Sequence, residues 1–131
     1  MLSILYISTM INEYTTAQLD ELLINFRNNN DKYNITGLLM YCDKNIIQYI
    51  EGENQNIIKL YDNICKDTRH TGIIKLFTKE IHSRRFTNWK MGYKNISIQE
   101  YINFIETATA ETYDKTIISL FNSFINVTVR Y

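Results

Sequence analysis

Residues 35–52, ITGLLMYCDKNIIQYIEG, predict a β-hairpin. The run from Ile35 to Cys42 is rich in residues that favour strands, Asp43-Lys44-Asn45 offers turn-forming side chains, and the apolar pattern resumes at Ile46. Side chains alternate between the two faces of a strand, so Ile46, Gln48 and Ile50 are expected to share one face. The hairpin therefore carries one neutral amide in the middle of an apolar surface.

Gln48 stands out because its neighbours on that face are both isoleucines. A glutamine side chain has two donors and two acceptor lone pairs, and leaving a buried one unpaired costs about 1–3 kcal/mol. Two interpretations are open. Either Gln48 is partly exposed or bonded to the backbone, or another polar group meets it.

The segment before the hairpin predicts a strand and then a helix. Leu2 to Thr9 alternates as a strand does, and Tyr6 lies among its aliphatic side chains, where it could be an ordinary core aromatic. A capping box at Thr15 and Gln18 is followed by apolar residues at helical spacing. That apolar stripe ends in two amides, Asn29 and Asn30, which could simply cap the helix.

A second helix and two further strands are predicted after the hairpin. The helix, capped by Glu53 or Asn54, ends in the polar cluster Asp67-Thr68-Arg69-His70, which could merely solvate its terminus. Gly72 is expected to break the helix, and Ile73 to Ile81 to form a strand. Alternation from Asn88 to Tyr93 predicts a last strand with three large side chains on one face, Trp89, Met91 and Tyr93, which would usually be packing residues.

The element order β-α-β-β-α-β-β predicts the α+β class, with a ferredoxin-like mixed sheet and both helices on one face. The other face needs a cover, which residues 98–126 can supply as two helices separated by the threonine-rich link 107–112. The apolar positions of these two helices are Tyr101, Ile102 and Ile105 in the first and Tyr113, Ile117, Leu120, Phe121 and Phe124 in the second. We expect a core at 1–97 and a C-terminal helical cap and tail at 98–131, within one domain.

Composition argues against several classes of protein. Lys+Arg and Asp+Glu both number 14, so no net field recruits nucleic acid or an anionic membrane surface. The longest apolar runs are far short of a membrane span, and Cys42 and Cys65 are too few for a disulfide framework. The four glycines are isolated, so no glycine-rich phosphate loop is present. Because the chain has no apolar run long enough for a membrane span and only two cysteines, we expect a cytoplasmic protein.

Residues that could carry catalysis or bind a metal are scarce. His70, His82 and Cys65 lack the compact spacing of a zinc site, and no Ser, Cys or Thr lies in a nucleophile motif. Neither a metal centre nor an enzyme is expected. What remains is a set of neutral hydrogen-bonding groups with two further side chains behind them: Tyr6, Asn29, Asn30 and Gln48, then Arg69 and His70. Amides of this kind suit a flat ligand with imide edges.

From Leu2 to about Tyr93 the chain resembles the BLUF family of flavin-binding blue-light sensors, in its short stand-alone form. The matching pieces are LSILYIS at 2–8, RNNN at 27–30, NITGLL at 34–39, IIQYIEG at 46–52, DTRH at 67–70 and RRFTNWKMG at 84–92. Two departures are minor: Asn45 stands in the hairpin turn where glycine is common, and Asn29 occupies a position that varies in the family.

The resemblance implies a non-covalent flavin between the two helices. FAD is the expected form, and FMN or riboflavin stays open because the phosphate end has no recognisable motif. Asn30 would bond the C4 carbonyl and N3 edge with Asn29 nearby, and Arg69 and His70 would serve the C2 carbonyl and ribityl side, with Asp67 orienting them.

The resemblance also implies a photocycle. Gln48 would lie between Tyr6 and the flavin, Tyr6 would pass an electron and a proton toward the flavin through Gln48, and the rotated or tautomerised amide would red-shift the absorption. Trp89 and Met91 would transmit the change.

Two other functions share the element order. A hydrolase of acylphosphatase type needs a phosphate-cradling loop, which this chain lacks. An RNA-recognition domain needs exposed strand aromatics beside basic residues, and the net charge of this chain is zero.

With no output domain expected in 131 residues, the signal should leave by contact with an unknown downstream protein or within a homo-oligomer. Phe121 and Phe124 are the expected contact residues, although they could equally be core.

Overall fold

The computed structural model describes residues 1–110, 112, 115, 116 and 119 of the chain. Its elements, in chain order, are β1 (Leu2–Met10), α1 (Thr16–Lys32), β2 (Thr36–Cys42), β3 (Asn45–Gly52), α2 (Asn54–Lys66), β4 (His70–Glu80), β5 (Gly92–Asn95) and α3 (Ile98–Ala110). None of the helices in these described residues is long and apolar enough to cross a bilayer.

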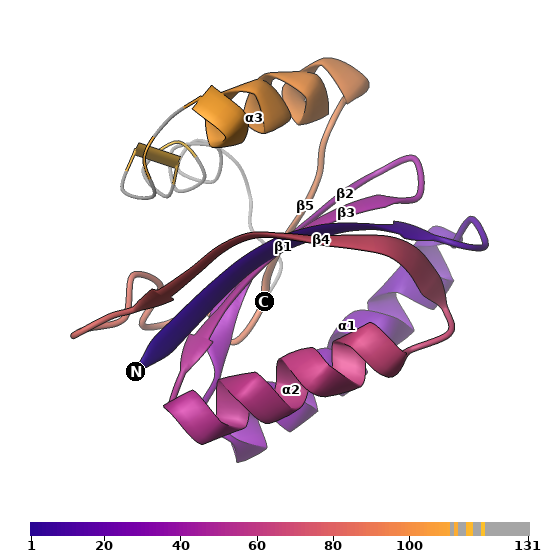
Figure 1. Cartoon of the computed structure of the whole chain (residues 1–131). Helices are drawn as coiled ribbons and strands as arrows, with labels where there is room; N and C mark the ends of the chain where they lie inside the picture. Colours follow the sequence, from indigo (N-terminus) through magenta and orange to yellow (C-terminus); the bar gives the residue numbers. More distant parts are fainter. Residues whose placement is uncertain (111, 113–114, 117–118, 120–131) are drawn as a thin grey trace.

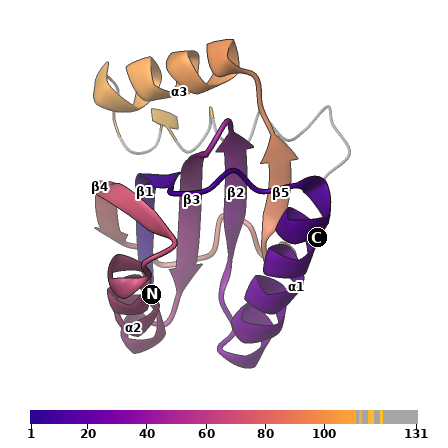
Figure 2. The ribbon, with the colours of Figure 1, turned by 90° about the vertical axis from the view of Figure 1, so that its right-hand side faces the viewer.

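The five strands form one mixed sheet in the order β4-β1-β3-β2-β5 (Figure 2). β1 pairs antiparallel with β3 and with β4, β3 pairs antiparallel with β2, and β2 pairs parallel with β5. Helix α1 connects β1 to β2, and these two strands run parallel on either side of β3. Helix α2 connects β3 to β4, and these two strands run parallel on either side of β1. The predicted ferredoxin-like arrangement is confirmed.

The sheet carries helices on both faces (Figure 1). α1 and α2 cover one face, which we call the cleft face, and α3 covers the other, which we call the α3 face. Each face has its own buried core: Leu19, Leu23 and Ile57 pack on the cleft face, and Phe104 and Ala108 pack on the α3 face. The second C-terminal helix was predicted on Tyr113, Ile117, Leu120, Phe121 and Phe124, all of which lie outside the described residues.

Local sequence signals set two of the element boundaries as predicted. The hairpin turns at Asp43 and Lys44, whose φ angles of 47° and 73° match a type I′ turn, the form whose twist suits a two-residue hairpin. Thr15 caps α1 through a complete capping box, because its side chain accepts from the Gln18 backbone while the Gln18 side chain accepts from the Thr15 backbone.

Three sequence predictions about element limits were wrong. Gly72 does not end a helix, because α2 stops at Lys66; it lies within β4 with φ +62°, beside an irregularity in the pairing with β1. The threonine-rich link is helical through Ala110, and the hydroxyls of Thr107 and Thr109 donate back to the carbonyls of Asn103 and Ile105, one turn earlier in the same helix. The last strand begins only at Gly92.

The short β5 also overturns the predicted common face for Trp89 and Met91. Trp89 packs with the core of the α3 face and stacks on Phe86 with ring centroids 5.6 Å apart. Met91 is fully buried in the core of the cleft face. Both residues precede the strand, so the two-residue alternation that the prediction assumed does not apply to them.

Candidate functional site

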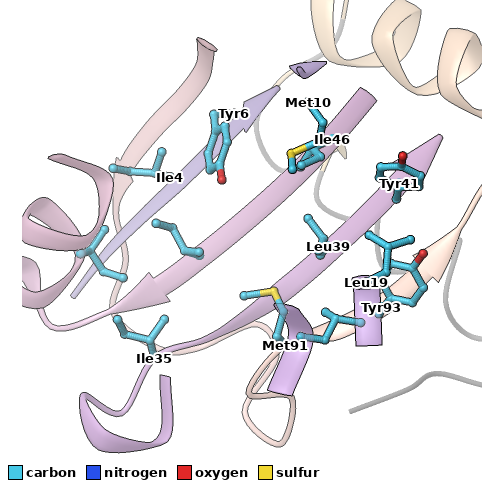
Figure 3. Close-up of a cluster of buried hydrophobic side chains, with 13 residues drawn as sticks. Ile4, Tyr6, Met10, Leu19, Ile35, Leu39, Tyr41, Ile46, Met91 and Tyr93 are labelled. Carbon is cyan, nitrogen blue, oxygen red and sulfur yellow. The ribbon is translucent and has the colours of Figure 1, made fainter. Parts of the chain in front are cut away.

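Tyr6 and Gln48 form a buried hydrogen bond across neighbouring strands. They face each other in the register of β1 and β3, and their side chains leave the sheet on the cleft face among Ile4, Ile46 and Ile50. The Tyr6 hydroxyl donates to Gln48 Oε1, and in Figure 3 it points toward β3. Tyr6 is 3% and Gln48 6% exposed, so of the two interpretations of Gln48 the structure supports a buried amide met by another side chain.

The other end of the Gln48 amide faces sulfur. Its Nε2 lies 3.5 Å from Met91 Sδ, and Met91 reaches the cleft face from the segment before β5 (Figure 3). A thioether is a weak acceptor. The amide is thus held firmly at its oxygen and loosely at its nitrogen.

Burial raises the pKa of the Tyr6 hydroxyl far above its usual value, with further contributions from Tyr61, Cys65 and Asp67. The Tyr61 ring packs edge-on against Tyr6 at 5.8 Å, and burial together with its bond to Cys65 raises the pKa of Tyr61 to about 12. Tyr6 therefore keeps its proton at any physiological pH and acts as the donor to Gln48.

A cleft lies between α1, α2 and this face of the sheet. Its space, including the open mouth, is about 560 Å³. Apolar side chains make up most of its wall: Met10, Leu22, Phe26, Leu39, Ile46, Leu60 and Ile64. The remaining lining residues are Tyr6, Asn30, Gln48, Asp67, Arg69 and His70, which are six of the seven residues predicted from the sequence as photochemical or cofactor-binding.

Asn30 and its neighbour Asn29 have different positions. Asn30 is buried at the end of the α1 stripe and donates from Nδ2 to the Lys90 carbonyl at 2.6 Å. Asn29 is exposed and lines the adjoining groove beside Tyr33 and Asn56. The structure thus brings Asn30 into the cleft and leaves Asn29 at its margin; whether Asn29 touches a cofactor stays a prediction.

The cluster after α2 is ordered by its own contacts. Asp67 binds the Arg69 side chain, with Nε 3.0 Å from Oδ1, and the pKa of the Asp67 carboxyl is lowered mainly by that hydrogen bond. His70 Nε2 donates to the Ile64 carbonyl at 2.6 Å, and its Nδ1 lies 2.9 Å from Ser8 Oγ. Arg69 and His70 are thus ordered by contacts within the protein, and both line the cleft.

Two structurally important residues were missed by sequence reasoning. Arg27 donates from Nε and Nη2 to the Met91 carbonyl, at 3.2 and 3.0 Å. Glu51 is fully buried, and its carboxylate accepts from Thr36, Tyr49 and the backbone amides of Arg85 and Phe86. Glu51 could have been noticed, because an acid two positions beyond Tyr49 shares its face. Arg27 lies in the matching piece 27–30, but nothing local indicates its role, since its partner is a distant carbonyl.

The geometry fits a flat heteroaromatic ligand with an imide edge. Apolar walls on α1 and α2 can take its faces, and the amides of Asn30 and Gln48 can both donate and accept along an edge that alternates carbonyl and N–H groups. The fold and the cleft define a small ferredoxin-like domain whose cleft has the shape and polar groups for such a ligand beside a buried Tyr–Gln pair.

Comparisons with known proteins agree with this class. The model of the BLUF family, described as sensors of blue-light using FAD, matches residues 1–92. The chain is 22% identical over 133 residues to the blue light- and temperature-regulated antirepressor BluF of Escherichia coli (strain K12), covering 96% of this chain and 33% of that protein. It thus spans about a third of that relative's length.

Two solved structures are similar. BlsA in its photo-activated state has a TM-score of 0.80 and 26% identity, over 99% of this chain and 98% of that one. A bacterial light-regulated adenylyl cyclase has a TM-score of 0.67 and 33% identity, over 94% of this chain and 33% of that one. The chain belongs to the BLUF family and is a blue-light photoreceptor of the flavin-binding type.

Proposed function

We propose that the buried hydrogen bond from Tyr6 to Gln48, at the wall of the cleft, is the photochemical centre of this sensor. The proposal rests on the position of the pair. Tyr6 is the donor, Gln48 is its acceptor, and both line the space in which the family's ligand would bind. When bound, the flavin supplies the absorption of blue light and, once excited, a one-electron oxidant.

Tyr6 and Gln48 can relay a proton without a net change of charge. A tyrosine that gives up an electron becomes strongly acidic, and Gln48 Oε1 is already its acceptor. Gln48 would take the Tyr6 proton at Oε1 and give a proton from Nε2 to the flavin that has accepted the electron. Tyr6 would then take back one electron and one proton from the flavin, which restores the phenol and leaves the amide as its imidic tautomer. The altered or rotated amide is then the stored signal, and it presents a different hydrogen-bonding edge to the ligand.

The remaining side chains hold the ligand. Asn30 would bind its imide edge, and Arg69 and His70, with Arg69 fixed by Asp67, would serve the opposite carbonyl and the ribityl chain. Asn29 would assist from the margin of the cleft. We propose FAD as the natural form, in keeping with the description of the family, with FMN and riboflavin as alternatives.

We propose that the signal leaves by protein contact, in a cytoplasmic sensor without enzymatic activity of its own. The similar proteins are named as an antirepressor and a light-regulated adenylyl cyclase, so coupling to another protein or domain is known among the relatives. Trp89 and Met91 would carry the change from Gln48 to α3 and to a homo-oligomeric or partner interface. The free thiols of Cys42 and Cys65 are compatible with a reducing compartment.

Illumination of the purified protein tests this function. We expect a yellow protein whose absorption shifts to longer wavelength under blue light and returns in the dark, with FAD released on denaturation. A colourless protein that takes up no flavin during reconstitution, or a yellow one with no reversible shift, would contradict the proposal.

A further inference from the structure

Three successive carbonyls, those of Trp89, Lys90 and Met91, are held from β2 and α1. The Gly37 N–H donates to Trp89 at 2.8 Å, Asn30 donates to Lys90, and Arg27 donates twice to Met91. The register of β2 with β5 starts only at Gly92. Side chains of α1, rather than the sheet ladder, therefore fix the backbone of Lys90 and Met91.

The contact between Met91 and Gln48 is too weak to hold Met91 in place. A thioether accepts hydrogen bonds poorly, and a methionine side chain has three rotatable bonds, so this contact alone does not fix the sulfur. The hydrogen bonds from Arg27 involve a charged donor and are roughly twice as strong as neutral ones. The stronger contact sets where the Met91 backbone lies, and the sulfur follows.

Arg27 lies close to the site without forming part of the cleft wall. It is one turn before Asn30 on α1, and partial burial lowers the pKa of its guanidinium. Asn30 lines the cleft, whereas Arg27 is not among the lining residues. A ligand can therefore contact Asn30 directly, while Arg27 reaches the Tyr6–Gln48 pair through Met91.

We propose that Arg27 is a positioning residue of the photochemical site, which holds Met91 Sδ against Gln48 Nε2 and so keeps Gln48 Oε1 turned toward Tyr6 in the dark. This inference rests on the proposed role of the Tyr6–Gln48 pair. The orientation of the Gln48 amide in the dark then depends on Arg27, which acts on the amide through Met91.

Nuclear Overhauser effects in the dark test the inference directly. In protein labelled at methionine methyls and glutamine amides, the wild type is expected to show a cross-peak between the Met91 methyl and the Gln48 side-chain amide. Arg27→Gln should lose this cross-peak. Arg27→Lys keeps the charge but not the two N–H donors of the guanidinium, so the cross-peak should be weaker in that variant. Because the measurement needs no light, it stands even if the photochemical role of Tyr6 is wrong.

The rate of dark recovery gives a second readout, which we expect to change by about fivefold or more in Arg27→Gln, the lower end of typical couplings. Lys90→Gln is the matched control: it breaks the exposed pair of Lys90 with Asp31 in the same segment but leaves the Met91 carbonyl held. This control should keep the cross-peak and the recovery rate. A wild-type cross-peak in Arg27→Gln overturns the inference; if that variant does not fold, a wild-type cross-peak in Arg27→Lys overturns it instead.

Discussion

The Gln48 amide is suited to act as a switch because its two ends have unequal partners. Its oxygen accepts from the Tyr6 hydroxyl, and its nitrogen contacts the weakly accepting Met91 thioether. Turning the amide over would exchange a strong acceptor for a donor in front of Tyr6, so the two orientations differ in energy. A side chain with two identical ends, or with no polar end, cannot store that difference.

Removing the amide should therefore abolish the photoproduct while sparing the fold. We expect Gln48→Leu to bind flavin, since it keeps roughly the same volume among Ile46 and Ile50, but to show no stable red shift under blue light. Gln48→Glu is the finer comparison, because a carboxyl group cannot repeat the exchange of donor and acceptor. Absorption spectra before and after illumination decide both; a native red shift in Gln48→Leu would place the switch elsewhere.

The raised pKa of Tyr6 has a consequence for stability in alkali. The pKa of Tyr6 in the folded state lies above its unfolded value of about 10. The protonated hydroxyl therefore contributes its full stabilisation of the fold below that pH, and this stabilisation is lost as the pH rises beyond it. We expect the melting temperature of wild type to fall above about pH 10, and to fall less steeply in Tyr6→Phe. The melting temperatures of the two proteins should be compared between about pH 9 and pH 11, around the unfolded tyrosine pKa. An equal fall in both proteins would contradict this prediction.

At the scale of elements, Glu51 connects the hairpin to the segment before β5. Two of its four donors are the backbone amides of Arg85 and Phe86, and Phe86 in turn stacks on Trp89. Replacing a buried carboxylate by an amide puts a donor where an acceptor is needed. This segment should consequently loosen when Glu51 changes.

We expect Glu51→Gln to lower the free energy of unfolding by about 2 kcal/mol, the cost of leaving a buried donor unpaired. Glu80→Gln, an exposed change at the end of β4, should stay within about 0.5 kcal/mol of wild type. Urea unfolding of the two variants measures both values. Equal stabilities would mean that the Glu51 contacts contribute nothing net.

The elements that depend on local signals could be predicted from the sequence, and those that depend on distant contacts could not. The hairpin, the capping box on α1 and the placement of Gln48 between isoleucines all follow from alternation and turn chemistry. The position of Met91 does not, because it is fixed by Arg27 from another element. The prediction that Trp89 shares a face with Met91 and Tyr93 was wrong because Trp89 precedes the strand and its ring packs on Phe86.

The candidate site shows the same division. Tyr6, Asn30 and Gln48 were recognisable as polar side chains on apolar faces, and the structure brings them to one cleft. That the cleft closes around them depends on how α1 and α2 cross the sheet. No local pattern distinguishes Asn30, which faces inward, from Asn29, which is exposed.

For the whole molecule, the segment before β5 joins the two faces of the sheet. Phe86 and Trp89 pack on the α3 face, and Met91 lies on the cleft face. A change at Gln48 can thus alter packing beneath α3 through one short piece of chain. Typical coupling energies of about 1–3 kcal/mol suffice to bias an interface in this way.

Amide hydrogen exchange in darkness and under illumination tests this route. We expect lower protection in the light for peptides covering residues 88–93 and α3, and unchanged protection in α2, which lies on the opposite face of the sheet from α3. Gln48→Leu, kept under the same lamp, controls for heating. Unchanged protection in both regions while the flavin spectrum shifts fully would show that the signal leaves by another path.

The most direct test of the central claim, that Tyr6 is the photochemical donor to Gln48, is the light-induced absorption shift of Tyr6→Phe beside that of Tyr41→Phe. Tyr41 is buried on the same face, and its hydroxyl has no hydrogen-bond partner in the part of the chain that the structure describes. We predict that both variants are yellow, that Tyr41→Phe shifts and recovers as wild type does, and that Tyr6→Phe shows no stable red shift. A normal, slowly reversing shift in Tyr6→Phe would contradict the account.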